Sequence, residues 1–528
     1  MSPESNPVSP FPTEATQQWR QPQPEIEGDD DDAEREEDIV EHLQPDNNNG
    51  PTHHPSAPPD ELFDIPTTVD PSYIISLIRK LLPVNDKQGD DSQEPASFSP
   101  KINGDIHSSN GDVDAMDVQN GVLSRSSDCP KMLTREEAWE ESGCILWDLA
   151  ANKEHAEFMA QNLVVDVLLA NLLTTDSVRV TEISLGIIGN LACHEVVMNQ
   201  MTTTNRFLET IANQVFSDDT PCLCEVCRLL TLGLQGCQSM EWAKALQSDS
   251  ILSRVLWIAE NTLNPTLTEK SVGMLLAIME NQQVVPILLP TLVKLGLPRL
   301  LVNLLAFEIE KLTGDRMPER YPALESILRT IETLSVIDDY SEEICSKKEV
   351  VQMAVELIKF PEKIEISSSC VTAAVLVANF LADAPDLALE LSKDLLLLQS
   401  LLDLLPFTSD DLEARNALWN VLARLLLRVK DIEMSSLHQY VWTFVSRLGL
   451  IEDALLDSEC DKSSGNEEIL TTVRTNLNSR TAAIQCIFNI SNQWKSLKKE
   501  KSEQHDTVLY VDVEDLQKLL DCCHKHGS

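Results

Sequence analysis

Four asparagines recur at one place in the helical pattern of this chain, each within the motif apolar–x–Asn–apolar. They are Asn190, Asn379, Asn420 and Asn489. A carboxamide offers both a hydrogen-bond donor and an acceptor, so amides spaced along a groove can pair with the backbone of an extended peptide. Gly186, four residues before Asn190, would leave room for such a partner. The pattern predicts a partner-binding row. The alternative is that each amide bonds within or between repeats and holds the helices together.

Cysteine and histidine gather in two places where a metal site is the alternative to ordinary packing. The first is Cys222, Cys224 and Cys227, of which the last two share a helix face in CEVCRLL. Small thiols are routine core residues, and no second pair with loop geometry accompanies them. The second is CCHKH at 522–526, where adjacent side chains point in different directions and cannot converge on one tetrahedral ion. We therefore predict no metal at either place.

The motif search for enzymes finds nothing that carries chemistry. The chain has no G-x-x-x-x-G-K-[ST], no G-x-G-x-x-G, no H-E-x-x-H and no G-x-S-x-G. The sequence predicts a protein that is not an enzyme, with no catalytic residues and no cofactor.

The elements that must position the amides are helices, of which 181–197 (TEISLGIIGNLACHEVV) is the most informative. At helical spacing it has a wide apolar arc and a strip without bulk formed by Gly186, Gly189, Asn190 and Cys193. Each glycine inside a helix costs about 1 kcal/mol relative to alanine. Packing must offset this cost, so we expect a neighbouring helix or a bound segment to come very close to the strip.

One repeat can be outlined in full, with a short helix at 155–162, a second at 164–173, a polar turn at 174–180 and the long third helix. Breaks follow at similar intervals, at Asn152, Asp176, 218–221, 248–250, 264–265, Gly296 with Pro298, Pro318, Pro361 and 408–411. Two shorter helices and a long third one are typical of armadillo repeats, and their period predicts about eight units. The predicted fold is an all-α armadillo-type solenoid with a disordered acidic N-terminal region.

Composition divides the chain into five segments. Residues 1–69 are predicted to be a disordered acidic region, 70–83 a short amphipathic helix that docks on the body or binds a partner, and 84–130 a disordered linker. The solenoid is predicted over 131–494. A linker and a C-terminal capping helix are predicted over 495–528.

Charge limits the classes of partner. The chain carries 85 acidic and 41 basic side chains, a formal net charge of −44. Phosphate backbones and anionic membranes need basic surface, so we predict no nucleic acid and no membrane partner. Proteins with basic or extended segments are the expected partners. No run qualifies as a membrane span, since the most apolar one, 395–407, contains Gln399, Ser400 and Asp403.

The block 137–236 resembles the serum amyloid A-like protein family, a group of eukaryotic armadillo-type proteins, of which the chain would be a plant-like or otherwise divergent member. The matching pieces are ILWDLA (145–150), EHAEFM (154–159), EISLGIIGNLACHE (182–195) and EVCRLL (225–230). The resemblance implies a nuclear, non-enzymatic protein linked to cell proliferation, and it supplies no ligand residues. In nuclear-import receptors of the armadillo class a tryptophan lies four residues before the asparagine, whereas Gly186 stands there in this chain.

Two functions are compatible with these observations. The favoured one is an intracellular scaffold, in the nucleus, the cytoplasm or both, that binds protein partners along its third helices. The alternative is a co-chaperone of the nucleotide-exchange type that clamps the ATPase lobe of a heat-shock chaperone. The sequence sets neither the partner nor the oligomeric state.

Overall fold

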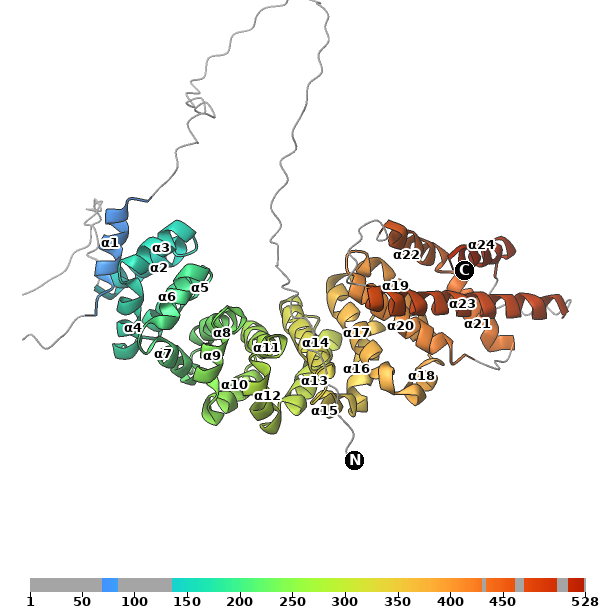
Figure 1. The fold of residues 1–528 in the computed structure, drawn as a ribbon, viewed down its shortest axis with the longest axis horizontal. Helices are drawn as coiled ribbons and strands as arrows, with labels where there is room; N and C mark the ends of the chain where they lie inside the picture. Colours follow the sequence, from blue (N-terminus) through green and yellow to red (C-terminus); the bar gives the residue numbers. More distant parts are fainter. Residues whose placement is uncertain (1–68, 84–134, 430–433, 461–469, 501–510, 527–528) are drawn as a thin grey trace, which may run out of the picture. The chain divides into compact units, whose positions relative to one another are not determined.

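The structure, a computed structural model, describes residues 69–83, 135–429, 434–460, 470–500 and 511–526 (Figure 1). All of them belong to one compact unit, Thr68–Ser528. Within these ranges every regular element is a helix and no strand occurs. The disorder predicted for 1–69 and 84–130 falls, apart from residue 69, outside the described residues.

The helices follow a repeated order of three, and the third is the longest in every unit except the fourth, whose second helix is longer than its third. Seven such units lie within the described ranges. The first four are α3 to α5 (Lys153–Gln161, Val164–Thr174, Val178–Ala192), α6 to α8 (Glu195–Thr203, Phe207–Asn213, Thr220–Gln235), α9 to α11 (Ser239–Leu246, Asp249–Asn261, Pro265–Glu280) and α12 to α14 (Val285–Lys294, Leu297–Gly314, Tyr321–Ser335). The other three are α15 to α17 (Ser341–Cys345, Lys348–Ile358, Ser367–Asp383), α18 to α20 (Pro385–Leu391, Leu395–Asp403, Leu412–Leu426) and α21 to α23 (Met434–Val445, Leu448–Cys460, Leu470–Glu500). Short 3₁₀ turns precede the third helix in four units, as η2 (Gln214–Phe216), η3 (Pro318–Arg320), η4 (Ile364–Ile366) and η5 (Leu405–Thr408).

The third helices form a continuous row. Helix α2 (Arg135–Leu149) packs against α5, and α5, α8, α11, α14, α17, α20 and α23 then pack each against the next (Figure 1). Helix α24 (Val513–His526) packs on α21, α22 and α23 of the last unit. Successive three-helix units joined through their third helices make an all-α armadillo-type solenoid, as the sequence predicts.

Most of the predicted breaks are N-caps, which explains why the helices begin where they do. Asn152, Asn264 and Asp411 each accept a hydrogen bond from the backbone N–H three residues later. Such caps satisfy one of the free N–H groups of the first turn and contribute about 1 kcal/mol each. At Gly296 the backbone has φ +104°, a left-handed conformation that favours glycine, and helix α13 starts directly after it.

The structure corrects the predicted helix 181–197 at both ends. Helix α5 already begins at Val178, because Ser177 accepts from the N–H of Val180 as its N-cap. It ends at Ala192, because His194 takes an extended conformation before α6 and its Nε2 lies 3.0 Å from the carbonyl oxygen of Ala150 on the preceding layer. The last residues of the predicted helix therefore belong to the next unit.

Helix α1 (Pro71–Lys80) docks on the first layers. Asp70 caps it by accepting from the N–H of Ser72 at 2.8 Å, and Ile74, Leu77 and Ile78 are buried against the body. The carbonyl oxygen of Leu81 accepts from Nε1 of Trp139 at 3.2 Å and from Nδ2 of Asn171 at 2.9 Å. The helix thus covers the end of the third-helix row, which is one of the two roles expected for it.

One segment departs from the expectation that nothing in the chain qualifies as a membrane span. By length and composition alone, Ile364–Ala382 could cross a bilayer, and two bent helix pairs, α3 with α4 and α12 with α13, would pass the same test if each were one span. Judged by helix length and composition, the expectation that no segment could span a membrane is therefore wrong. Ile364–Ala382 includes most of α17, which packs against α14, α16 and α20, so its apolar residues also serve the solenoid core.

A buried ion pair holds the connection between α13 and α14. Glu308 on α13 is 1% exposed in its side chain and Arg320 in η3 is 9% exposed. Arg320 donates through Nε at 2.8 Å and Nη2 at 2.6 Å to the two carboxylate oxygens, and through Nη1 to the carbonyl oxygen of Leu263 at 3.1 Å. Both charges are therefore neutralised with full hydrogen bonding, which is the condition under which buried pairs are tolerated.

We expect Glu308→Gln to lower the free energy of unfolding by about 3 kcal/mol, because Arg320 would stay buried without a compensating charge. The matched control is Glu241→Gln, whose pair with Lys244 has both side chains more than half exposed and should cost less than about 1 kcal/mol. Chemical denaturation followed by circular dichroism measures both. Equal effects of the two changes would contradict the assignment.

Candidate functional site

The third-helix face, meaning the partly exposed side of α2, α5, α8, α11, α14, α17 and α20, contains most of the predicted site residues. Side chains from neighbouring layers occupy the space beside two of its glycines. A Cβ added at Gly186 would lie 2.1 Å from the ring of Trp147 on α2, and one at Gly189 would lie 2.3 Å from the guanidinium of Arg228 on α8. The close approach expected at this strip is therefore made by two neighbouring helices of the chain.

Asn190 lies at the centre of a hydrogen-bonded network that joins three layers. Its Nδ2 donates to the carbonyl oxygen of Trp147 at 2.9 Å, and its Oδ1 accepts from Nη1 of Arg228 at 3.2 Å. Arg228 also donates to the carbonyl oxygen of Gly186 and, through Nε and Nη2, to Glu225 on its own helix. Both ends of this amide are used between layers, which is the alternative that the sequence left open.

The other three asparagines differ in their surroundings. Nδ2 of Asn379 donates to Oγ of Ser335 on α14 at 3.0 Å, and Oδ1 of Asn420 accepts from Oγ of Ser479 on α23. Asn489 on α23 is exposed. Two more amides are thus engaged with an adjacent third helix. Binding of a partner by the predicted set Gly186, Asn190, Asn379, Asn420 and Asn489 stays a prediction.

A row of carboxylates that the motif search missed runs along the same face. It has one member in the second turn of each of five successive third helices, α2, α5, α8, α11 and α14. Its members are Glu140, Glu182, Glu225, Glu269 and Glu325, and all five are only partly exposed. We call this set the carboxylate row.

Each carboxylate of the row is held in place by a neighbour. Arg179 pairs with Glu182 at 2.6 Å and with Glu140 of the preceding layer at 4.0 Å, and Arg228 pairs with Glu225 at 2.6 Å. The interaction with Glu182 raises the pKa of Arg179 above its ordinary value.

The fourth and fifth carboxylates of the row, Glu269 and Glu325, are held in the same way. Nζ of Lys270 lies 3.3 Å from Glu269, and Glu325 accepts from Oγ of Ser369 at 2.8 Å and from Oγ1 of Thr372 at 2.9 Å. The row is therefore a positioned array of acceptors in which arginine, lysine and hydroxyl donors are already present.

The signal that could have found the carboxylate row is its spacing. Glu140, Glu182, Glu225 and Glu269 recur at almost one repeat length. The fifth member is displaced along the sequence, because the unit of α12 to α14 contains the long helix α13 and the turn η3. An alignment of the repeats by their N-caps would have shown the row.

The cysteines of the second layer behave as core residues. Burial raises the pKa of Cys222 and of Cys227 to about 12, and that of Cys224 to about 11. A metal ligand has to be the thiolate, which these surroundings disfavour. Among the residues that the structure describes, no group of three or more His, Cys, Asp or Glu is arranged to hold a metal ion.

The histidines and cysteines near the C-terminus are part of helix α24. Cys523 is buried on the inner side of this helix, whereas His524 is exposed and stacks on the ring of Phe488 at 6.3 Å between centroids. The side chains therefore diverge around the helix.

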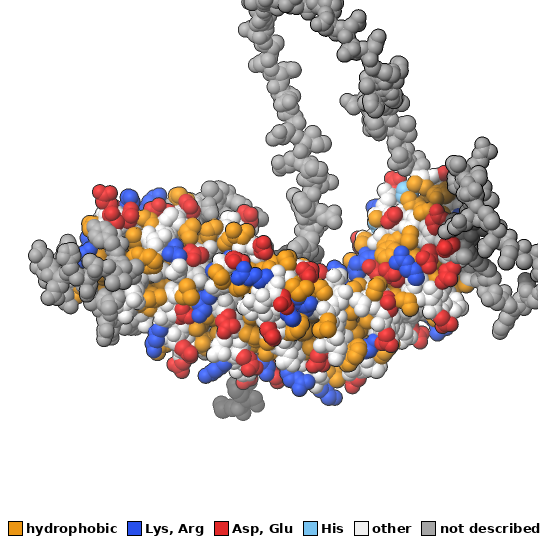
Figure 2. Space-filling model, turned by 180° about the vertical axis from the view of Figure 1, so that it is seen from behind, with side chains coloured by type: hydrophobic (Ala, Val, Ile, Leu, Met, Phe, Trp, Pro, Cys, Tyr) orange, Lys and Arg blue, Asp and Glu red, His pale blue; other side chains and the backbone are white. Residues whose placement is uncertain are grey.

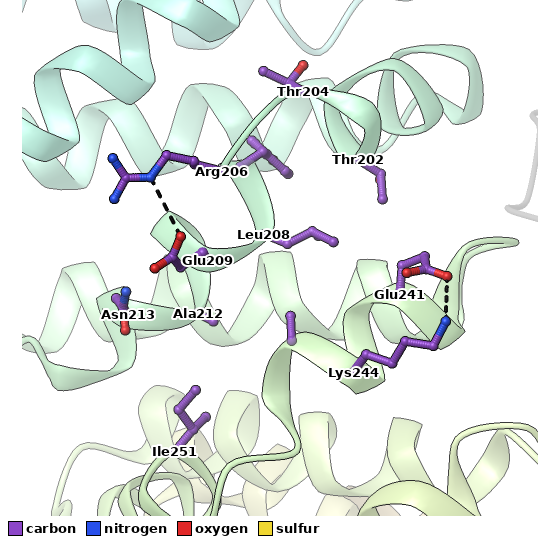
Figure 3. Close-up of a pocket in the computed structure, with 12 residues that line it drawn as sticks. Thr202, Thr204, Arg206, Leu208, Glu209, Ala212, Asn213, Glu241, Lys244 and Ile251 are labelled. Carbon is purple, nitrogen blue, oxygen red and sulfur yellow. Dashed lines mark hydrogen bonds and ion pairs between the residues drawn. The ribbon is translucent and has the colours of Figure 1, made fainter.

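An open cavity of about 470 Å³ lies on the first and second helices of the second and third units (Figure 3). Its apolar floor includes Phe207 and Ile251. Two exposed ion pairs flank it on opposite sides, Arg206 with Glu209 at 3.6 Å and Lys244 with Glu241 at 2.8 Å (Figure 3). Because these charges are satisfied by each other, the cavity presents no set of convergent free groups that would select a ligand.

Sequence comparison finds relatives over part of the chain. No family model matches it. The protein named saal1 of Danio rerio is 31% identical over 139 residues, which is 26% of this chain and 29% of that protein. Protein SAAL1 of Homo sapiens is 26% identical over 148 residues, which is 28% of this chain and 31% of that protein. The matches thus span less than a third of the length of each relative.

Structural comparison finds designed and engineered proteins. A designed armadillo repeat protein, solved in complex with the peptide (KR)4, is 14% identical and has a TM-score of 0.37, with 48% of this chain and 95% of that chain covered. Another engineered protein is 15% identical and has a TM-score of 0.38, with 75% of this chain and 96% of that chain covered. The assignment of the fold rests on the three-helix units themselves.

We expect Gly186→Ala to destabilise the protein by about 1–3 kcal/mol, because the new methyl group would collide with the buried face of Trp147. The matched control is Gly273→Ala, four residues after Glu269 on α11 as Gly186 is four after Glu182 on α5. A Cβ at Gly273 meets nothing within 4 Å, so this change should stabilise its helix by up to about 1 kcal/mol. Thermal unfolding measures both changes in stability. If both variants were stabilised or both destabilised, the close packing of Trp147 against Gly186 would be contradicted.

We expect iodoacetamide at pH 7.5 to alkylate Cys193 and Cys237, which are exposed, and to leave Cys227 and Cys370 unmodified. Burial raises the pKa of the latter two to about 12, so almost none of either thiol is ionised at this pH. Peptide mass spectrometry measures the modified fractions. Rapid labelling of Cys227 in the folded protein would show that the layer opens. Denatured protein, in which all thiols should react, serves as the control.

Proposed function

We propose that this protein is a non-enzymatic interaction scaffold whose third-helix face binds an extended basic segment of a partner protein. The observation that supports the proposal is the carboxylate row, which repeats one partly exposed acidic group per layer over five layers. Packed helices lie about 8–10 Å apart, and an extended chain advances about 3.3 Å per residue. A partner with a basic residue at every third position would therefore meet one carboxylate per layer.

Competition for these carboxylates is physically reasonable. Their present partners, Arg179, Arg228 and Lys270, are themselves partly exposed, so an incoming lysine or arginine can share the same oxygen atoms without burying an unpaired charge. The net charge of −44 adds a long-range attraction for basic segments, which speeds encounter without selecting a site.

We also propose that the chain belongs to the serum amyloid A-like family and shares the properties that this resemblance implies. The partial relationship to SAAL1 proteins supports it, as do the pieces around Trp147 and Asn190. We propose on that basis that the protein acts in the nucleus, the cytoplasm or both, and that it takes part in the control of cell proliferation. A co-chaperone that binds a heat-shock ATPase is the competing function.

The proposal is tested with a fluorescein-labelled peptide of 15 residues that carries lysine at every third position between serine and glycine. The variant Glu140→Gln/Glu182→Gln/Glu225→Gln should bind it at least about tenfold more weakly in fluorescence anisotropy at 150 mM salt. The matched control is Glu154→Gln/Glu195→Gln/Glu241→Gln, which removes the same charge from exposed sites on the first helices α3, α6 and α9.

Equal weakening in the two triple variants would mean that only the overall charge acts, and no binding to the wild type would remove the peptide from the proposal. Proximity labelling with the same variants then distinguishes the competing function. Selective loss of heat-shock ATPase chaperones from the labelled proteins, without any effect on peptide binding, would favour the co-chaperone.

A further inference from the structure

A second surface of the solenoid is apolar where loops are usually polar. Four consecutive turns between a second and a third helix each expose one large apolar side chain. These are Phe216 before α8, Leu263 before α11, Met317 before α14 and Ile364 before α17, and they are 48%, 77%, 37% and 81% exposed. We call this row the turn edge. Figure 2 shows hydrophobic side chains gathered in several patches on one side of the molecule, bordered by charges of both signs.

An arginine of helix α10 contacts the first of these turns. Arg254 on α10 donates to the carbonyl oxygens of Val215 at 3.1 Å and Ser217 at 2.7 Å, which flank Phe216 in the preceding unit. Its guanidinium also lies 4.4 Å from the ring centre of Trp257, a half-exposed residue of α10. Phe216 and Trp257 thus border the same arginine and extend the apolar surface from one layer to the next.

Two further arginines join the remaining turns. Arg320 reaches back to the carbonyl oxygen of Leu263, and Arg316, in the same turn as Met317, pairs with Glu362 at 2.5 Å and lies 5.9 Å from the ring centre of Phe360. Glu362 belongs to the turn that ends with Ile364. The turns before α11, α14 and α17 are therefore linked in order, and the turn before α8 is linked through Arg254 to helix α10 of the next unit.

Single exposed apolar residues are normal on protein surfaces, but here each of four consecutive second-to-third turns exposes a large one, which makes a longer apolar row. The exposed parts of these side chains gain no burial within the solenoid, although Phe216 and Met317 are more than half covered. Exposed carboxylates lie beside them, on Asp218, Glu260, Glu319, Glu362 and Glu365. Exposed basic side chains are fewer on these turns, where Arg254 and Arg320 are largely covered and paired.

The backbone of the turn edge selects the kind of partner. Its free N–H groups are already capped, for example by Asp219 on the N–H of Cys222 and by Asn264 on the N–H of Leu267. An extended partner would find no row of backbone groups to pair with, whereas a helix satisfies its own. Seven residues of helix rise about 10.5 Å, close to the distance of about 8–10 Å between packed layers.

We propose that the turn edge binds an amphipathic helix of a partner protein, with an apolar residue at every seventh position and lysine or arginine beside it. The apolar residues contact Phe216, Leu263, Met317 and Ile364 in turn, and the basic residues face the carboxylates between them. This site is separate from the carboxylate row and does not depend on the function proposed for the third-helix face.

The experiment uses the full chain and a labelled 28-residue peptide with leucine at every seventh position, lysine on both sides of each leucine and alanine elsewhere. The variant Leu263→Ser/Ile364→Ser should bind it at least about tenfold more weakly, because two leucine contacts are lost. The control, Val196→Ser/Leu389→Ser, changes two other exposed apolar residues, 62% and 47% exposed, on the first helices α6 and α18 and should bind like the wild type. A peptide with glutamate in place of lysine should not bind.

Hydroxyl-radical footprinting locates the peptide independently, and protection of Trp257 and Met317 is expected. Equal affinity of both double variants, or protection only at other residues, would overturn the proposal. A wild-type dimer in sedimentation that Leu263→Ser/Ile364→Ser dissociates, with no peptide binding, would overturn it too by showing a second copy of the chain as the occupant.

Discussion

The close contact between successive third helices is the constraint on which the rest of this structure depends. It is closest around α5, where Gly186 receives the ring of Trp147 and Gly189 receives the guanidinium of Arg228. A side chain at Gly186 would collide with the ring of Trp147, and one at Gly189 would displace the guanidinium of Arg228. Two helix-breaking residues within one helix cost about 2 kcal/mol of helix propensity, and the bulk of a tryptophan and an arginine packed into the vacated strip offsets that cost.

Hydrogen bonds then fix the register of layers that are already in contact. The last turn of a helix leaves carbonyl groups without intrahelical donors, and the next third helix supplies them from side chains. Nδ2 of Asn190 donates to the carbonyl oxygen of Trp147 near the end of α2, and Nδ2 of Asn281 donates to that of Leu234 near the end of α8. Because the register is fixed in this way, side chains at equivalent positions come into line, and Glu182 and Glu225 follow Glu140 along the face.

The sequence was sufficient for the features that arise within one helix and its cap. Asn152, Ser248, Asn264 and Asp411 mark helix starts because an N-cap depends only on residues close by in the chain. The end of α5 was misplaced because it depends on the ring of His194, which bonds to a residue of the preceding layer. The geometry of the candidate site also depends on contacts between layers, which the sequence does not show. Gly186 and Asn190 were recognised as unusual from their types, but the helices that fill the space beside them could not be deduced. The turn edge was missed because each of its side chains is unremarkable within its own loop.

In a solenoid, a side chain that recurs at one position of successive units forms a continuous row on the surface. The stability of a solenoid is close to a sum of terms between neighbouring layers, so an exposed position is free to vary without consequence for distant units. This chain has glutamate on successive third helices and an apolar residue in successive second-to-third turns. The carboxylate row and the turn edge therefore have the same spacing but different chemistry. A partner for either row has to match only that spacing, and each additional layer it reaches adds a weak contact to one already made. The affinity of such contacts combines because the second is formed at high effective concentration. If both proposals hold, specificity would depend on how many consecutive layers a partner can follow, more than on the strength of any one contact.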